Sequence, residues 1–66
     1  MGYYVKVIRD RGTVTWLRRG REVLAPGAAT YYHHPSAAQI AAKSHEAQLN
    51  SPSVQCVIVN VKDLER

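Results

Sequence analysis

One uninterrupted helical segment stands among short strand-like segments, and this feature limits the possible folds more than any other. No proline or glycine interrupts residues 37–49, and Asn50 begins an N-S-P stop signal. Pro35 restricts the residue before it to extended geometry, and Ser36 followed by Gln39 matches a capping box. The sequence therefore predicts one helix over about residues 37–49, capped by Ser36.

This helix is expected to be amphipathic, with a shallow apolar face. Its polar face comprises Gln39, Lys43, Glu46 and Asn50. The opposite arc consists of Ala37, Ala38, Ile40, Ala41, Ala42, Ala47 and Leu49, with Ser44 among them. Small side chains let a helix lie close to a sheet, although each buries little apolar area.

Two strands joined by a tight turn are predicted before the helix. Residues 3–9 and 13–18 alternate between two faces and are rich in β-branched and aromatic side chains. Between them, Gly12 suits the positive-φ position of a short hairpin loop. A further turn signal, R-G-R, precedes a short third strand at 22–24, and residues 30–32 are also expected to be extended.

The last predicted strand, residues 53–62, carries apolar side chains on both faces, so we expect it at the centre of the sheet. Residues 62–66 are expected to form a charged tail. The chain is thus predicted to be a single α+β domain over residues 1–66. Its sheet is small and mainly antiparallel, in the order β-β-(β)-α-β, with one α-helix packed on one face.

One helix covers one face of a sheet, which leaves the second face to be explained. This face is expected to carry some of Tyr4, Ile8, Leu17, Val54 and Ile58. So apolar a face predicts a homodimer that covers it. The alternative is a monomer in which the stems of Arg and Lys side chains shield it.

The net charge of +4 lies entirely in the first third of the chain. Residues 1–22 carry this excess, whereas acidic and basic residues balance in residues 23–66. Five arginines of the first segment lie in or beside its turns: Arg9, Arg11, Arg18, Arg19 and Arg21. Such asymmetry indicates a surface for an acidic partner, or basic turns that serve solubility alone.

The sequence contains no pattern typical of catalysis or of metal binding. His33 and His34 are adjacent in an extended segment, so their side chains point to opposite sides. His45 lies about 15 Å further along the helix. Cys56, in an apolar strand, is expected to be a core residue rather than a nucleophile. We therefore expect no enzyme activity, no cofactor and no metal ion.

Compartment is indicated by what the sequence lacks. A single cysteine and no secretory signal favour a cytoplasmic protein. No apolar run approaches the ~20 residues that span a bilayer, so no membrane partner is expected.

Protein–protein recognition is the leading hypothesis for function, because Tyr, Trp and Arg dominate interaction hot spots. The candidate partner-binding residues are Arg9, Arg11, Trp16, Arg18, Arg19 and Arg21, with Tyr31, Tyr32 and His33 as a second patch. Alternation predicts that only one of Tyr31 and Tyr32 faces solvent. The alternative hypothesis is nucleic-acid binding, in which the basic hairpin combines phosphate contacts with base stacking.

The order of motifs also resembles a group of known small proteins. A YYVKV first strand, a hairpin ending in TWL, a YxHPSAAQIAA helix entry and a VQCVIVNVKDLE last strand follow one another. This pattern is similar to that of small β-β-α-β accessory proteins of bacteriophages, prophages and other mobile elements. The resemblance implies an inhibitor or adaptor that occupies a surface of a host protein, as anti-CRISPR and other anti-defence proteins do. It implies no catalytic residue, and the basic first third differs from the acidic, DNA-mimicking members.

Overall fold

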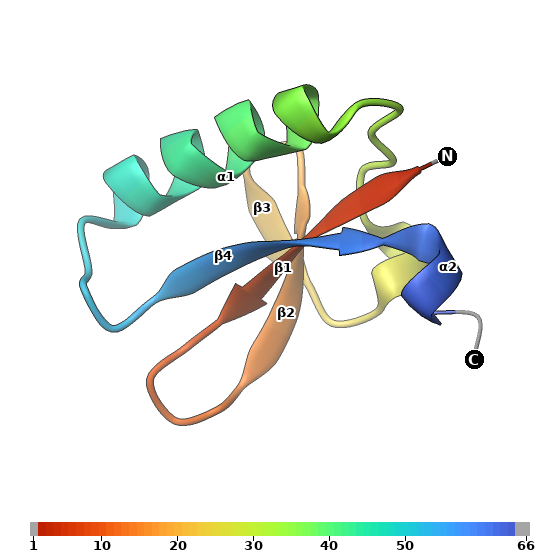
Figure 1. Cartoon of the computed structure of the whole chain (residues 1–66). Coiled ribbons are helices and arrows are strands. Elements are labelled where there is room, and N and C mark those ends of the chain that lie inside the picture. Colours follow the sequence, from red (N-terminus) through yellow and green to blue (C-terminus); the bar gives the residue numbers. More distant parts are fainter. Residues whose placement is uncertain (1, 65–66) are drawn as a thin grey trace.

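A computed structural model describes residues 2–64, which form a four-stranded antiparallel sheet with one long helix across one face (Figure 1). The elements are β1 (Tyr3–Ile8), β2 (Val14–Arg18), β3 (Arg21–Val23), the 3-10 turn η1 (Pro26–Ala28), α1 (Pro35–Leu49), β4 (Gln55–Asn60) and α2 (Val61–Leu64). The predicted α+β class and the order β-β-(β)-α-β are confirmed. A short helix, α2, occupies most of the predicted charged tail, and residues 65–66 lie outside the described part.

The strand order across the sheet is β3-β2-β1-β4, so β1 is central and β4 is an edge strand. The β1–β4 register runs from the pair Tyr3–Asn60 to the pair Ile8–Gln55. The prediction that the last strand lies at the centre is therefore wrong. Apolar residues on both sides of a strand indicate that both of its faces are covered. They do not indicate whether one or both of its edges pair with another strand.

The core lies between α1 and one face of the sheet. Its buried members are Val5, Val7, Leu17, Ala38, Ala42 and Val54, and Ile58 packs against them half-buried. Of the five residues from which the opposite face was expected to draw, Leu17, Val54 and Ile58 belong to the helix side instead. Alternation shows which residues share a face, but it does not decide which face of each strand the helix covers.

The face opposite α1 follows from the register of the strand pairs. Its residues are Tyr4, Lys6, Ile8, Val14, Trp16, Arg18, Arg21, Val23, Gln55, Val57 and Val59. We call it the open face. Of the apolar residues expected there, only Tyr4 and Ile8 lie on it.

The ends of α1 differ in how well local signals predict them. The helix begins at Pro35, and its N-cap residue His34 makes no side-chain capping bond. The predicted capping box at Ser36 is therefore wrong, because Pro35 takes the first helical position, where its missing N–H costs nothing. At the other end Asn50 adopts φ = 47° and ψ = 42° and donates its N–H to the Glu46 carbonyl oxygen, as the stop signal predicts.

The buried stripe of α1 comprises Ala38, Ala42 and His45. Ile40, expected to face inward, is exposed instead. The alanines let the helix lie close to the sheet, and the bulk of the core comes from the strands.

Both hairpin loops contain a glycine with positive φ. Gly12 has φ = 78°, as predicted for the β1–β2 loop, and Gly20 has φ = 83° in the β2–β3 loop. The expected extended segment before α1 is also present, since Tyr32 forms an isolated antiparallel bridge with Tyr3. Within residues 2–64, no helix combines the length and the apolar character needed to cross a membrane.

Candidate functional site

The β2–β3 turn gathers three exposed arginines. Arg18 and Arg21 are direct cross-strand partners, and Arg19 and Gly20 form the two-residue loop between them. Arg19 has φ = 47°, and positive φ at both loop residues is what a type I′ turn requires. A left-handed conformation costs a residue with a Cβ about 1 kcal/mol or more, and like charges opposite each other in a sheet repel. Both features of this turn lower the stability of the fold, and such locally unfavourable features are typical of functional sites.

These arginines form no salt bridge within the described residues. Both salt bridges among residues 2–64 involve Glu22, and neither involves Arg18, Arg19 or Arg21. Three guanidinium groups therefore stand next to one another with their hydrogen-bonding capacity available to a partner.

The segment after β3 adds an exposed tyrosine. Arg18, Arg19 and Tyr31 line a shallow hollow of about 480 Å³ together with residues 27–30. Backbone hydrogen bonds hold this segment to the turn: Arg19 N–H donates to Thr30 Oγ1 at 3.0 Å, and Thr30 N–H donates to a β2 carbonyl at 3.1 Å. We call Arg18, Arg19, Arg21 and Tyr31 the arginine surface.

Of the two adjacent tyrosines, Tyr31 faces solvent and Tyr32 does not. Tyr31 is 46% exposed, whereas Tyr32 is half-buried and packs against the core under α1. The predicted alternation of the two tyrosines is confirmed.

A chain of edge-to-face aromatic contacts fixes Tyr31. Tyr4 packs against both Trp16 and Tyr31, with ring centroids 6.4 and 6.0 Å apart, and Tyr31 packs against His33 at 5.0 Å. A Cβ on the buried Gly2 would overlap the Tyr31 ring, so only glycine allows this position. Trp16 is 7% exposed and serves this packing, although it lies on the open face.

Arg9 belongs to a separate polar cluster on the helix side of the sheet. Arg9 Nε donates to Glu22 Oε1 at 3.0 Å, and Arg9 Nη2 donates to Glu22 Oε2. Thr15 Oγ1 donates to Oε1 at 2.6 Å, and His45 Nε2 lies 3.0 Å from Oε2. Glu22 therefore joins β1, β2, β3 and α1 through a single carboxylate.

These contacts decide the ionisation of Glu22. The hydrogen bond from Arg9 lowers the pKa of Glu22 to about 2, against the opposing effect of burial. An ionised carboxylate only accepts hydrogen bonds, so His45 Nε2 must be the donor. Nδ1 of His45 is buried without a hydrogen-bond partner in the described chain.

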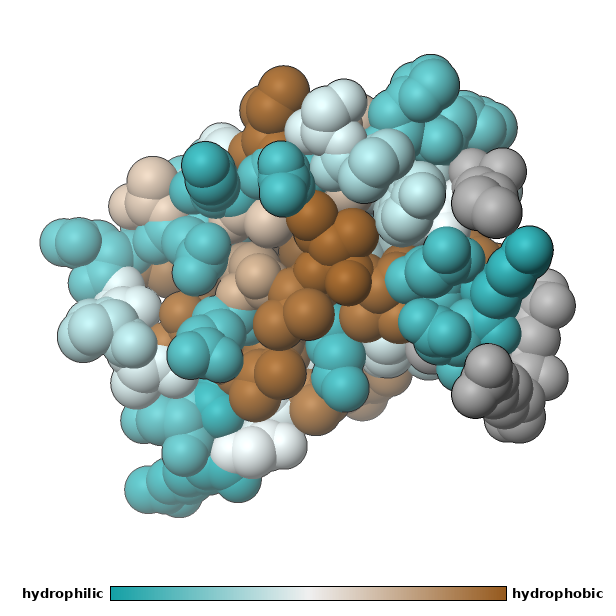
Figure 2. Space-filling model, in the orientation of Figure 1, coloured by the Kyte–Doolittle hydropathy of each residue, from teal (hydrophilic) through white to brown (hydrophobic). Residues whose placement is uncertain are grey.

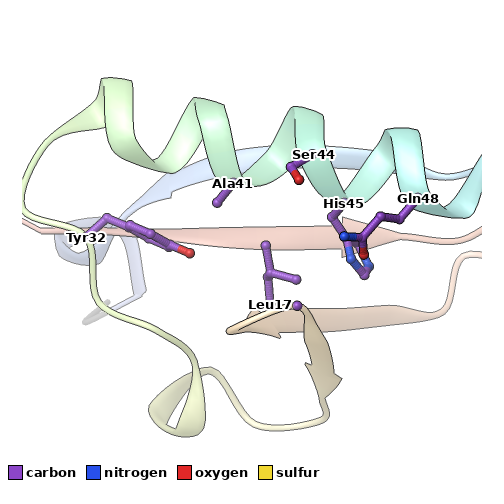
Figure 3. Close-up of a pocket in the computed structure, with 7 residues that line it drawn as sticks. Leu17, Tyr32, Ala41, Ser44, His45 and Gln48 are labelled. Atoms are coloured by element: carbon purple, nitrogen blue, oxygen red, sulfur yellow. The ribbon is translucent and has the colours of Figure 1, made fainter.

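A small pocket between α1 and β2 opens beside this cluster (Figure 3). Its lining residues are Leu17, Gly20, Tyr32, Ala41, Ser44, His45 and Gln48. Tyr32 points into it from the segment before α1, Leu17 from β2, and His45 and Gln48 from the helix (Figure 3). Its volume of about 110 Å³ suits a few water molecules rather than a drug-sized ligand.

The remaining chemically versatile side chains form no site in the described chain. Across residues 2–64, no three His, Cys, Asp or Glu side chains lie close enough to hold a metal ion. Partial burial raises the pKa of the Cys56 thiol to about 11, so this cysteine is a poor nucleophile at neutral pH.

Comparisons with known proteins do not extend this description. No protein-family model, no curated protein and no solved structure matches the chain.

The candidate residues from the sequence fall into several groups in space. Arg18, Arg19, Arg21 and Tyr31 form the arginine surface, and the His33 ring packs edge-to-face against Tyr31. Arg11 is exposed in the β1–β2 loop, at the opposite end of β2. Arg9 is engaged by Glu22, while Trp16 and Tyr32 are used in packing.

Sequence reasoning missed Glu22, Thr15, His45 and Gly2. One signal for His45 was present, because it continues the Ala38–Ala42 stripe at helical spacing. Glu22 and Gly2 carry no such local signal, since their partners are distant in the chain.

Proposed function

We propose that this chain is a non-enzymatic interaction module that binds an acidic surface of a protein through the arginine surface. The observation that carries the proposal is the β2–β3 turn, where three arginines form no salt bridge within residues 2–64 although Arg19 has positive φ and Arg18 lies opposite Arg21. An inhibitor or adaptor of a host protein, as the sequence resemblance implies, is one form of such a module.

The apolar surroundings of the arginines favour a protein over a nucleic acid. Leu24 directly follows β3 and is 83% exposed, and Val23 lines a hollow of about 340 Å³ with the three arginines. An exposed leucine and a half-buried valine add nothing to phosphate binding, whereas apolar side chains are a normal part of protein interfaces. The aromatic rings suited to base stacking are largely committed, since Trp16 is buried and Tyr4 packs between two other rings.

Affinity capture from an extract of the source cells tests this proposal, with the tagged wild-type chain as bait. We expect at least one protein that binds the wild-type chain and is lost with the double variant Arg18→Glu, Arg19→Glu. Arg11→Glu is the matched control, because it makes a charge reversal in the other hairpin loop and should leave capture unchanged. Circular dichroism of each variant verifies that the fold is intact.

The outcome that contradicts the proposal is capture that does not depend on the arginine surface. If the double variant retains every protein that the wild-type chain binds, the interaction lies elsewhere. Leu24→Asp is tested as a separate variant. If it also loses binding, the contact with the partner is apolar as well as charged.

Single-stranded nucleic acid is a second candidate, favoured by the position of Tyr31 beside Arg18 and Arg19. An exposed ring next to two guanidinium groups suits one stacked base and its phosphates. Anisotropy of a labelled oligonucleotide would then show affinity falling with salt, with a log–log slope of about −0.7 per phosphate contacted. Absence of binding at ~50 mM salt, where such contacts are strong, removes this candidate.

A further inference from the structure

β4 is an edge strand of the described sheet, and its own residues carry none of the charges and prolines that usually protect a sheet edge. Its six residues, Gln55–Asn60, include no charged residue and no proline. The opposite edge strand, β3, has only three residues, two of which are Arg21 and Glu22. Proteins protect their edges with short strands, charges and prolines, because an unprotected edge pairs with other strands. β3 is protected in this way and β4 is not.

Hydrogen bonds at one end of β1 show which backbone groups of β4 are free. Tyr3 exchanges N–H···O bonds of 2.8 and 2.9 Å with Tyr32, on the side of β1 away from β4. Gly2, the preceding residue, accepts a bond from Val61 N–H, on the β4 side. In an antiparallel ladder, successive residues direct their backbone groups to alternate sides. Even-numbered residues of β1 therefore bond to β4.

The partners of those residues on β4 are Gln55, Val57 and Val59. The N–H and C=O groups of the intervening Cys56, Ile58 and Asn60 consequently point away from β1. Among residues 2–64, no strand pairs with this row of backbone donors and acceptors along the outer edge of β4.

The side chains beside this edge are apolar. Figure 2 shows hydrophobic side chains gathered over β4, between the polar surfaces of α1 and of the β1–β2 hairpin. Val57 is 41% exposed on the open face, and Cys56, Ile58 and Val59 are only partly covered. Both the backbone and the side chains of β4 are therefore ready to pair with another strand.

We propose that β4 pairs antiparallel with β4 of a second copy, which joins the two sheets into one. The pairing is self-complementary when its two-fold axis passes at Val57, which then lies opposite its own copy on the open face. Cys56 of each copy then lies opposite Ile58 of the other copy on the helix side. The net charge of +4 lies in the first third of the chain, so two copies repel through that part, whereas the uncharged β4 edges meet without repulsion.

The length of β4 determines how tightly two copies are expected to bind. Six residues span about 20 Å, so strand pairing alone gives an interface at the small end of specific ones. We therefore expect a dissociation constant in the micromolar range and a concentration-dependent equilibrium. This proposal does not rest on the arginine surface, which lies at the opposite edge of the sheet.

Analytical ultracentrifugation of the whole chain and its variants tests the pairing. We expect the wild-type chain to shift from 7.4 kDa toward twice that mass as its concentration rises through the micromolar range. Val57→Lys and Val57→Glu should each remain monomeric, since like charges then meet across the two-fold axis. An equimolar mixture of the two variants should recover the dimer, which a merely misfolded variant would not do.

The control is Val14→Lys, on the open face but on β2, which should dimerise like the wild-type chain. Val57 lies opposite Lys6 on β1, so a new charge at position 57 also affects the stability of the fold. Urea denaturation of both Val57 variants measures this effect. A wild-type chain that stays at 7.4 kDa at high micromolar concentration overturns the proposal. A dimer that persists in both Val57 variants also overturns it, because the interface then lies away from β4.

Discussion

Arg19 and Glu22 show how differently neighbouring polar residues of one hairpin are used. Arg19 adopts the left-handed conformation that Asn or Gly would take more easily, and it makes no salt bridge in the described chain. Glu22, three residues later, binds Arg9, Thr15 and His45. The second residue serves the fold, whereas we propose that the first serves a partner.

Replacement of Arg19 by Asn should therefore separate stability from binding. Asn-Gly is the preferred pair for a type I′ loop, so we expect Arg19→Asn to raise the free energy of unfolding by up to about 1 kcal/mol. The same change should weaken binding to the captured partner. Urea denaturation and a binding titration measure the two effects, with Arg11→Asn as the neutral control. A less stable Arg19→Asn variant would show that the turn is not strained.

The carboxylate of Glu22 should make stability depend on acid pH. Its pKa falls from the usual 4.5 to about 2 in the folded chain, so the unfolded chain takes up this proton first. The stabilisation is complete above about pH 4.5 and is lost as the pH falls toward 2. We expect Glu22→Gln to cost about 1–3 kcal/mol at neutral pH, because buried donors lose a charged acceptor.

Urea denaturation of the wild-type chain and of Glu22→Gln across this pH range checks the direction of the pH dependence. The stability difference between the two should shrink as the pH is lowered, whereas Glu46→Gln on the polar face of α1 should show little effect at any pH. A difference that stays constant from neutral pH to pH 2 would contradict the role assigned to Glu22.

At the scale of elements, the fold depends on a close approach between α1 and the sheet. Ala38 is fully buried at this contact, whereas the adjacent Ala37 is exposed. We expect Ala38→Leu to cost about 1–3 kcal/mol, because a larger side chain forces the helix away from β1 and β4. Ala37→Leu should change stability by less than about 0.5 kcal/mol. Equal effects of the two changes, measured by urea denaturation, would mean that the helix does not lie so close.

The elements themselves are local features, and the sequence predicts most of them for that reason. Alternation identifies β1 and β2, Gly12 marks their turn, and Asn50 marks the end of α1. The place of β4 at the edge depends instead on which strand pairs with β1, and that pairing spans the whole chain. Local sequence patterns therefore do not predict this pairing.

The same distinction explains the candidate site. The basic residues and Tyr31 were predicted because composition and alternation are visible in sequence. Which arginines are free was not predictable, since Arg9 meets Glu22 13 residues away and Glu22 meets His45 23 residues away. The structure thereby narrows the candidate residues from the whole basic hairpin to those of the arginine surface.

At the scale of the whole molecule, the two proposed surfaces do not compete. The arginine surface includes residues of β2 and β3, and β4 forms the opposite edge of the sheet. A dimer joined through β4 would carry an arginine surface at each outer end. Such an arrangement raises apparent affinity for a partner that presents two acidic sites at the matching distance.

The most direct test of the central claim is to observe which backbone amides respond when the captured partner binds. Amide ¹H–¹⁵N spectra of the labelled chain suit a protein of 7.4 kDa. We expect the largest changes at residues 18–21 and 28–31, with Arg11 and its loop unaffected. Changes confined to the β1–β2 loop or to α1, with residues 18–21 unmoved, would contradict the assignment of the arginine surface as the binding site.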